Sequence, residues 1–141
     1  MNKNDQLLGI LENGIEKLKL NVAIISEIID KNYRVAICKT ENSSIKVGDQ
    51  FELSCTYCSD VIKENKTKYY KDVADITEML KHPCYQNTQL RAYIGTPIII
   101  NGVTWGTLNY SSLSPHKESY TDEEVLFIES QAKEIASILN N

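Results

Sequence analysis

The chain has 141 residues, of which 42% are hydrophobic and 24% are charged, and its formal net charge is −4 at pH 7. This length and composition predict one globular domain with a real hydrophobic core. The acidic balance argues against a nucleic-acid partner, because proteins that bind phosphate backbones carry a basic stripe.

Targeting signals and membrane spans are missing from the sequence. The N-terminus lacks the apolar run of a signal peptide, and no stretch approaches the roughly 18–20 apolar residues of a membrane-spanning helix. We therefore expect a cytoplasmic protein with no membrane partner. Since the cytosol keeps thiols reduced, Cys38, Cys55, Cys58 and Cys84 are not expected to form disulfides.

Both ends of the chain show the apolar spacing of amphipathic helices. Residues 4–19 place leucine and isoleucine three and four positions apart. Residues 121–139 carry a similar stripe and open on a capping box, in which Thr121 accepts a hydrogen bond from the backbone N–H of Glu124 while the Glu124 side chain reaches back.

Strand patterns and turn signals lie between these helices. Asp30-Lys31-Asn32 is a turn signal between two segments rich in β-branched residues, and Asn101-Gly102 tolerates the positive φ angles of a type I′ hairpin turn. Residues 54–65 are expected to be a helix, and residues 77–89 a short helix broken by Pro83. The pattern predicts an α+β domain around one antiparallel sheet. The expected strands are residues 21–29, 33–40, 69–73, 98–100 and 103–110.

Six short motifs occur in a fixed order along the chain. They are Gly48 with Phe51, Thr56-Tyr57-Cys58, His82-Pro83-Cys84-Tyr85, residues 93–97 from Tyr93 to Pro97, Gly106-Thr107-Leu108, and Thr121-Asp122. Together they resemble GAF domains, especially those beside bacterial sensor histidine kinases and cyclases. The resemblance identifies residues 1–141 as a single GAF domain, with the sheet and pocket loops in residues 21–110.

The resemblance carries expectations about fold and function. It implies a central antiparallel sheet with the N- and C-terminal helices on one face and a loop-covered pocket on the other. It implies a small-molecule-binding sensory or regulatory domain in cytoplasmic signal transduction, with an unknown ligand and a downstream signalling domain or protein as a partner. We expect no cofactor, because no haem or bilin motif and no Gly-rich phosphate loop is matched.

The candidate ligand-binding residues are aromatic or polar and fall where the resemblance places the pocket. A mostly apolar pocket with a few convergent polar groups is the usual form of such a site. Tyr110 is a further candidate to line the pocket, and His116, in a polar loop, is expected to be exposed. The ligand-binding set is Tyr57, Cys58, Cys84, Tyr85, Tyr93 and Asn109.

The cysteines leave three interpretations open, namely a zinc site, packing in the core and catalysis. Cys55 and Cys58 form a Cys-x-x-Cys motif at a predicted helix start, where the helix dipole lowers the pKa of a thiol. A zinc site needs a second pair of ligands that the sequence lacks, so no metal is expected. We favour packing as small hydrophobic side chains, above all for Cys38 in an apolar run.

Catalysis is the alternative function. In free methionine-(R)-sulfoxide reductases, a branch of the GAF family, a thiolate attacks the sulfoxide sulfur and a second cysteine resolves the sulfenic acid as a disulfide. The resemblance places the nucleophile at Cys84 and the resolving cysteine at Cys58. The carboxylates of that branch fall at Asn109, Ser111 and Tyr93, so the substrate's amino group loses its electrostatic partner. We therefore expect a binding domain rather than an enzyme.

The terminal helices are also the expected dimer surface. Related helices in sensor proteins form parallel bundles, and the resemblance therefore favours a homodimer through residues 4–19 and 121–139. The sequence leaves open whether the chain is a stand-alone sensor or a module of a longer protein.

Overall fold

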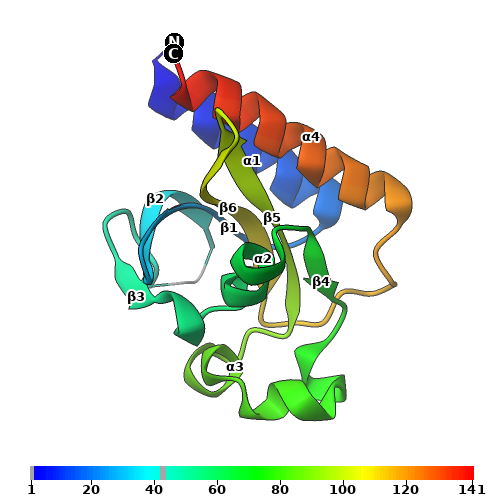
Figure 1. The fold of residues 1–141 in the computed structure, drawn as a ribbon. Helices are drawn as coiled ribbons and strands as arrows, with labels where there is room; N and C mark the ends of the chain where they lie inside the picture. Colours follow the sequence, from blue (N-terminus) through cyan, green and yellow to red (C-terminus); the bar gives the residue numbers. More distant parts are fainter. Residues whose placement is uncertain (1, 42–43) are drawn as a thin grey trace.

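The computed structural model describes residues 2–41 and 44–141, and a six-stranded antiparallel sheet forms their centre. The strand order is β3-β2-β1-β6-β5-β4. Helices α1 (Lys3–Leu18) and α4 (Asp122–Leu139) lie side by side, and the two chain termini meet at one end of this pair (Figure 1). In the described part of the chain, each helix is too short or too polar to cross a lipid bilayer.

Two long hairpins form the middle of the sheet. β1 (Val22–Ile29) pairs with β2 (Asn32–Thr40), and β5 (Ala92–Ile100) pairs with β6 (Val103–Ser112). β1 and β6 then join the hairpins. Asn101 and Gly102 have φ angles of 52° and 78°, which confirms the positive φ angles expected of a type I′ turn.

The two edge strands are short and differ from the sequence prediction. β3 (Gln50–Glu52) pairs with β2 and is absent from the predicted strands, because three residues are too few for an alternating pattern to indicate a strand. β4 (Lys68–Tyr70) pairs with β5 and ends earlier than expected. The chain leaves the sheet at Asp72, whose side chain accepts a hydrogen bond from the backbone N–H of Ala74 and caps a short turn.

The segments between the edge strands form several short helices rather than the two expected ones. The first expected helix is split, and its regular part begins at Cys58. Pro83 begins a helix instead of breaking one, because the first helical position needs no backbone N–H donor. The elements are η1 (Leu53–Cys55), α2 (Cys58–Glu64), η2 (Val73–Asp75), η3 (Thr77–Lys81) and α3 (Pro83–Thr88).

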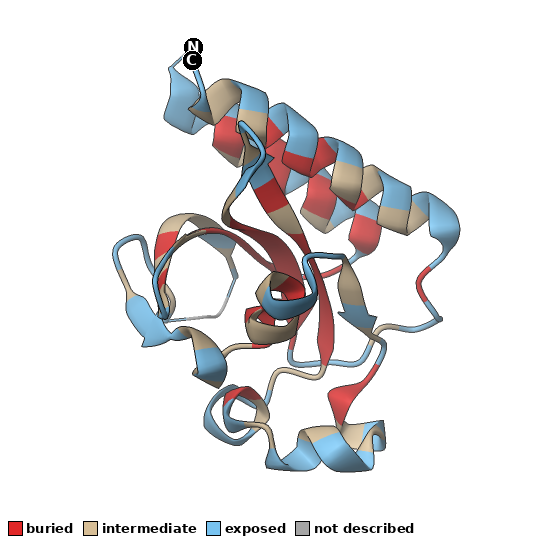
Figure 2. Ribbon diagram, in the orientation of Figure 1, coloured by how far each residue is buried: buried red, intermediate tan, exposed pale blue. Residues whose placement is uncertain are grey.

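Each face of the sheet has its own buried cluster. On one face, the apolar stripes of α1 and α4 pack on alternate residues of the central strands. On the other face, α2, α3 and the loops cover a second cluster rich in tyrosine and cysteine. Figure 2 shows buried residues along the central strands and on the helix sides that face them. This arrangement confirms the expected fold class. The residues that the two apolar stripes contribute to the buried cluster on the helix face include Leu7, Leu11, Leu18, Ile128, Ala132 and Ile135.

Two of the sequence-based placements are wrong. Tyr110 lies on the helix face of the sheet rather than in the pocket, and its hydroxyl donates to Gln131 Oε1 at 2.6 Å. His116 is not exposed, since only 11% of its side chain is accessible and its ring stacks on Tyr120 with 4.3 Å between centroids. Tyr110 faces the helices because successive residues of a strand alternate between the two faces of the sheet. His116 is half-buried because its loop returns to α1.

Cys38 lies at the margin of the pocket-face cluster rather than in its centre. It is half-buried, and its sulfur lies 3.9 Å from the carbonyl oxygen of Ile45. Its position on β2 explains this, because β2 has only the three-residue strand β3 on its outer side.

The terminal helices use their apolar stripes within one chain. Their outward faces carry mainly polar residues such as Gln6, Glu12, Asn13, Glu134 and Ser137. The homodimer therefore stays a prediction that rests on the family resemblance. Light scattering over a wide concentration range tests it, with a dimer mass as the expected result and a single-chain mass at every concentration as the contrary one.

Two glycines of α1 give a matched test of the helix packing. A methyl group at Gly14 would overlap the Tyr110 ring and hydroxyl, whereas one at Gly9 would meet nothing within 4 Å. Gly9→Ala should stabilise the protein by about 0.5–1 kcal/mol, because alanine is the better helix former. Gly14→Ala should instead destabilise it by about 1–3 kcal/mol through overpacking. Urea unfolding of both variants measures the contrast, and equal shifts would refute the packing at Gly14.

Candidate functional site

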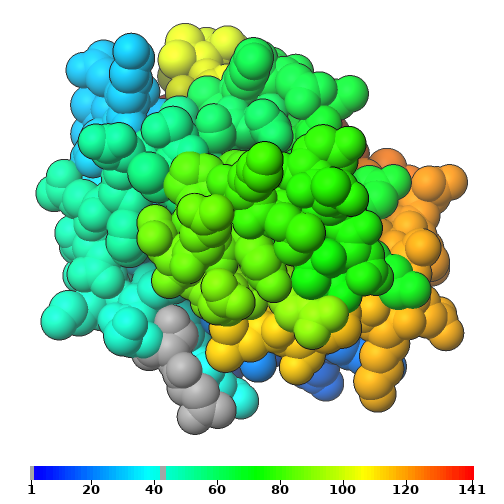
Figure 3. Space-filling model, turned by 90° about the horizontal axis from the view of Figure 1, so that it is seen from below, coloured from blue at the N-terminus to red at the C-terminus, as the bar shows by residue number. Residues whose placement is uncertain are grey.

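A small hollow lies on the pocket face, between the sheet and the segments that include α2 and α3. We call it the tyrosine–cysteine pocket, and its volume is about 80 Å³. In Figure 3, which looks onto this end of the molecule, green and teal segments close over the sheet. The aromatic and aliphatic lining includes Ile24, Tyr33, Phe51, Tyr57, Leu90 and Tyr93. The sulfur-bearing and polar lining includes Cys55, Cys58, Cys84, Asn109 and Ser111.

Local hydrogen bonds hold the segments that carry these side chains. The Tyr57 hydroxyl donates to the carbonyl oxygen of Leu90 at 2.7 Å, which ties the start of α2 to the segment before β5. At the start of α3, His82 Nδ1 accepts the backbone N–H of Cys84 at 3.0 Å. These two hydrogen bonds hold Cys58 and Cys84 against the sheet.

An ion pair joins the two ends of the segment that carries α3. Arg91 Nε lies 2.9 Å from Asp72 Oδ1, and a second guanidinium nitrogen lies 2.5 Å from Asp72 Oδ2. These hydrogen bonds from Arg91 lower the pKa of the Asp72 carboxyl. The two-point contact therefore joins both ends of the 72–91 segment beside the pocket.

A buried polar network forms the floor of the pocket. Asn109 Nδ2 donates to the Tyr33 hydroxyl at 3.1 Å and to Thr107 Oγ1 at 3.2 Å. Thr107 in turn lies 2.6 Å from Ser26 Oγ and 3.2 Å from the Cys58 sulfur. All of these side chains are buried. The network therefore connects three strands and the first residue of α2 beneath the pocket.

Five of the six predicted ligand-binding residues meet at this pocket, namely Tyr57, Cys58, Cys84, Tyr93 and Asn109. Tyr85 does not line it; it is half-buried on α3 and packs beside the same cluster. Sequence reasoning missed Tyr33, although alternation along β2 from the buried Val35 would have placed it on the same face.

Burial favours the protonated form of the Cys58 and Cys84 thiols. Burial raises the pKa of Cys58 to about 11, and burial likewise raises the pKa of Cys84. The expected lowering by a helix start at Cys58 is therefore wrong. Removal of the sulfur from water outweighs the dipole of α2, which has only seven residues.

The pocket holds neither charge nor a metal-binding cluster among the residues that the structure describes. Its described lining includes no Asp, Glu, Lys, Arg or His side chain. Across residues 2–41 and 44–141, no three potential ligand side chains converge as a metal site requires. The chemistry offered to a ligand is thus neutral hydrogen bonding and aromatic contact.

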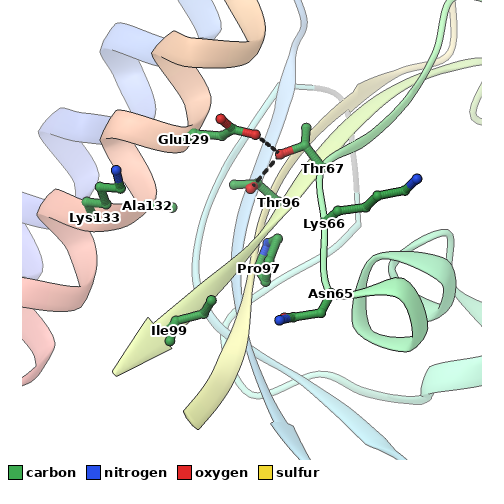
Figure 4. A pocket seen from close by; sticks show the side chains of 9 residues that line it. All are labelled: Asn65, Lys66, Thr67, Thr96, Pro97, Ile99, Glu129, Ala132 and Lys133. Atoms are coloured by element: carbon green, nitrogen blue, oxygen red, sulfur yellow. Dashed lines mark hydrogen bonds between the residues drawn. The ribbon is translucent and has the colours of Figure 1, made fainter. Parts of the chain in front are cut away.

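A larger hollow of about 560 Å³ lies between α1 and α4, and two further large hollows lie elsewhere on the surface. One, of about 460 Å³, separates α4 from the loop between α2 and β4 (Figure 4). Thr67 lies at the edge of this hollow. Its hydroxyl donates to Glu129 Oε2 at 2.5 Å and lies 2.8 Å from the Thr96 hydroxyl. The other, of about 860 Å³, lies beside the end of α1 and is lined by lysines and glutamates. Both are surface grooves, and neither contains the predicted site residues.

Comparison with known proteins identifies relatives of this architecture. A sequence profile of a family described as GAF domain matches residues 5–140. Among curated proteins, no sequence matches the chain.

Solved structures share the fold at low sequence identity. The GAF domain of an Acinetobacter phosphoenolpyruvate-protein phosphotransferase is 13% identical, with a TM-score of 0.77 over 99% of this chain and 83% of that one. A type II free methionine-R-sulfoxide reductase from Thermoplasma acidophilum is 15% identical, with a TM-score of 0.76 over 98% and 92%. The phycocyanobilin-bound GAF domain of a cyanobacterial phytochrome is 11% identical, with a TM-score of 0.76 over 99% and 85%.

The pKa of Cys58 gives a prediction for stability at alkaline pH. The thiol titrates near 9.0 when unfolded and near 11 in the folded protein. Its burial therefore stabilises the fold fully below pH 9, and this contribution is lost as the pH rises from 9 to 11. The loss should amount to about 2–3 kcal/mol, from the roughly 1.4 kcal/mol per pKa unit.

Cys58→Ser isolates this effect, since a serine hydroxyl does not titrate in this range. Urea unfolding at pH 8, 9, 10 and 11 should show the stability gap between wild type and variant shrinking by that amount. The tyrosines are present in both proteins, so the part of their titration that does not depend on Cys58 cancels in the difference. A gap that stays constant across this range would contradict the buried, protonated thiol.

Proposed function

The chain belongs to the GAF domain family, and from that premise we propose that it is a sensory domain whose tyrosine–cysteine pocket binds a small molecule. The proposal places the protein in the cytoplasm, with a downstream signalling domain or protein as the partner that receives the signal. Tyr57, Cys58, Cys84, Tyr93 and Asn109 are the proposed ligand contacts.

One observation carries this proposal. The side of the sheet away from α1 and α4 holds a pocket with aromatic walls and a floor of fixed polar groups. Such a combination of apolar lining and few polar groups is the usual form of a small-molecule site. Light-sensing phytochrome domains are among the solved structures with this fold.

A thiol enzyme is the second candidate, because Cys58 and Cys84 line one pocket and a reductase shares the fold. Two features favour binding over catalysis. Burial raises the pKa of Cys84, the nucleophile of that mechanism, and so disfavours the thiolate form that would attack the sulfoxide. The described pocket lining also has no carboxylate to hold the ammonium group of an amino acid.

Cys84→Ser separates the two functions. If the domain is a sensor, a metabolite at 100 times its Kd should raise the melting temperature of the wild type by about 10 °C. The Cys84→Ser variant keeps a small polar group at this ligand contact and should still be stabilised, by a smaller amount. Native mass spectrometry of protein purified from its host supplies the candidate ligand. If the domain is an enzyme, wild type should reduce free methionine-(R)-sulfoxide with a dithiol, and Cys84→Ser should not. Turnover of that kind would overturn the proposal.

A further inference from the structure

We infer that the tyrosine–cysteine pocket recognises an uncharged carboxamide, or a neutral group with the same hydrogen-bond donor and acceptor, through Asn109 and Ser111. The inference rests on the proposed binding function and specifies its ligand class. It follows from two buried polar side chains on β6 that have atoms left without a partner.

Asn109 leaves one acceptor open toward the pocket. Only 4% of the residue is exposed, and both hydrogens of Nδ2 are used by Tyr33 and Thr107. Its Oδ1 makes no hydrogen bond to any side chain or backbone group that the structure describes, yet it is not sealed from the pocket space. Because this acceptor is open toward the pocket and has no partner within the described chain, a ligand that donates a hydrogen bond can satisfy it.

Ser111 offers the complementary group. The residue is 3% exposed and lines the pocket, and its hydroxyl has no hydrogen-bond partner among the described residues. Asn109 and Ser111 are two positions apart on one strand, so they point to the same side of the sheet about 6.6 Å apart. A carboxamide with a hydrogen bond of about 2.9 Å at each end bridges a gap of this size.

Three hydroxyls of the pocket walls do not compete for a ligand. The Tyr57 hydroxyl donates to Leu90, the Thr56 hydroxyl to Leu53, and the Thr88 hydroxyl to the backbone of Cys84. These groups are committed to holding the pocket walls. The ligand is therefore recognised from the sheet side, by β6.

The pocket selects against charge. A buried ion without a partner costs several kcal/mol, and the described lining has no side chain of either charge to offset that cost. A carboxylate would face the free oxygen of Asn109, and two acceptors repel. A cation would find one amide oxygen but no counter-ion.

Size and shape narrow the ligand further. A volume of about 80 Å³ is well below the roughly 150 Å³ of an engineered cavity that takes benzene. The closed pocket thus suits a group of about four or five non-hydrogen atoms. The Tyr57 and Tyr93 rings pack edge to face, with 5.4 Å between their centroids, and form one aromatic wall of the pocket.

Three isosteric probes test this inference directly. Acetamide, acetate and acetamidinium share size and planarity but carry charges of 0, −1 and +1. Titration into the protein at pH 8, followed by amide chemical shifts in NMR, should place acetamide at β6 and α2. Acetate and acetamidinium should bind at least tenfold more weakly. Equal affinities, or shifts confined to the two surface grooves, would overturn the inference.

Asn109→Asp tests whether the pocket selects ligands by charge, because it should increase the affinity for acetamidinium. The introduced carboxylate can accept hydrogen bonds from the Tyr33 and Thr107 hydroxyls, and it adds a negative charge. Acetamidinium should therefore bind at least tenfold more tightly, and acetamide more weakly. Asn13→Asp, the same change on the exposed face of α1, is the matched control and should change neither affinity. An Asn109→Asp protein that folds but keeps the wild-type order of affinities would refute the role of Asn109.

Ser111→Ala keeps the test decisive if Asn109→Asp does not fold. Loss of one hydroxyl should weaken acetamide binding about three- to tenfold while the melting curve stays cooperative; unchanged binding would count against the inference. If acetamide fails to bind while another metabolite stabilises the protein, the ligand class is wrong and the sensory function stands. If no small molecule stabilises the protein, the proposed function fails with it.

Discussion

The alternation of side chains along β6 is the constraint on which the rest of this structure depends. Leu108 and Tyr110 point toward α1 and α4, whereas Thr107, Asn109 and Ser111 face the other side of the sheet, where Asn109 and Ser111 line the tyrosine–cysteine pocket. Because successive residues of a strand face opposite sides, one strand serves both a hydrophobic core and a polar pocket floor. A shift of one residue in its pairing with β1 or β5 would exchange the two sets and destroy both layers.

Burial governs the chemistry of the pocket more than local helix electrostatics do. Cys58 is the first residue of α2, yet its sulfur is enclosed by Thr107 and Tyr93 and its pKa rises. The same burial raises the pKa values of Tyr33 and Tyr93. The pocket is consequently a neutral environment in which hydrogen bonds, rather than ion pairs, distinguish one ligand from another.

The pocket side of the sheet is joined to the helix side at one edge. The loop that leaves α2 reaches α4 through the hydrogen bond between Thr67 and Glu129 (Figure 4). The Thr67 hydroxyl has a single hydrogen, which Glu129 accepts, so Thr96 donates to the Thr67 oxygen. These hydrogen bonds connect the loop that follows α2, rather than α2 itself, to the C-terminal helix.

The sequence by itself determined the architecture, because its signals are local. The stripes of the terminal helices, the capping box at Thr121 and the Asn101-Gly102 turn each depend on neighbouring residues, and the structure contains all three. The ordered motifs added the family and a set of candidate pocket residues, of which Tyr85 and Tyr110 lie away from the lining. The tertiary structure alone decided how these residues behave. The raised pKa of Cys58, the free oxygen of Asn109 and the placement of Tyr110 on the helix face depend on what distant segments bring into contact. Desolvation and hydrogen-bond satisfaction are set by those neighbours, and no local pattern in the sequence records them.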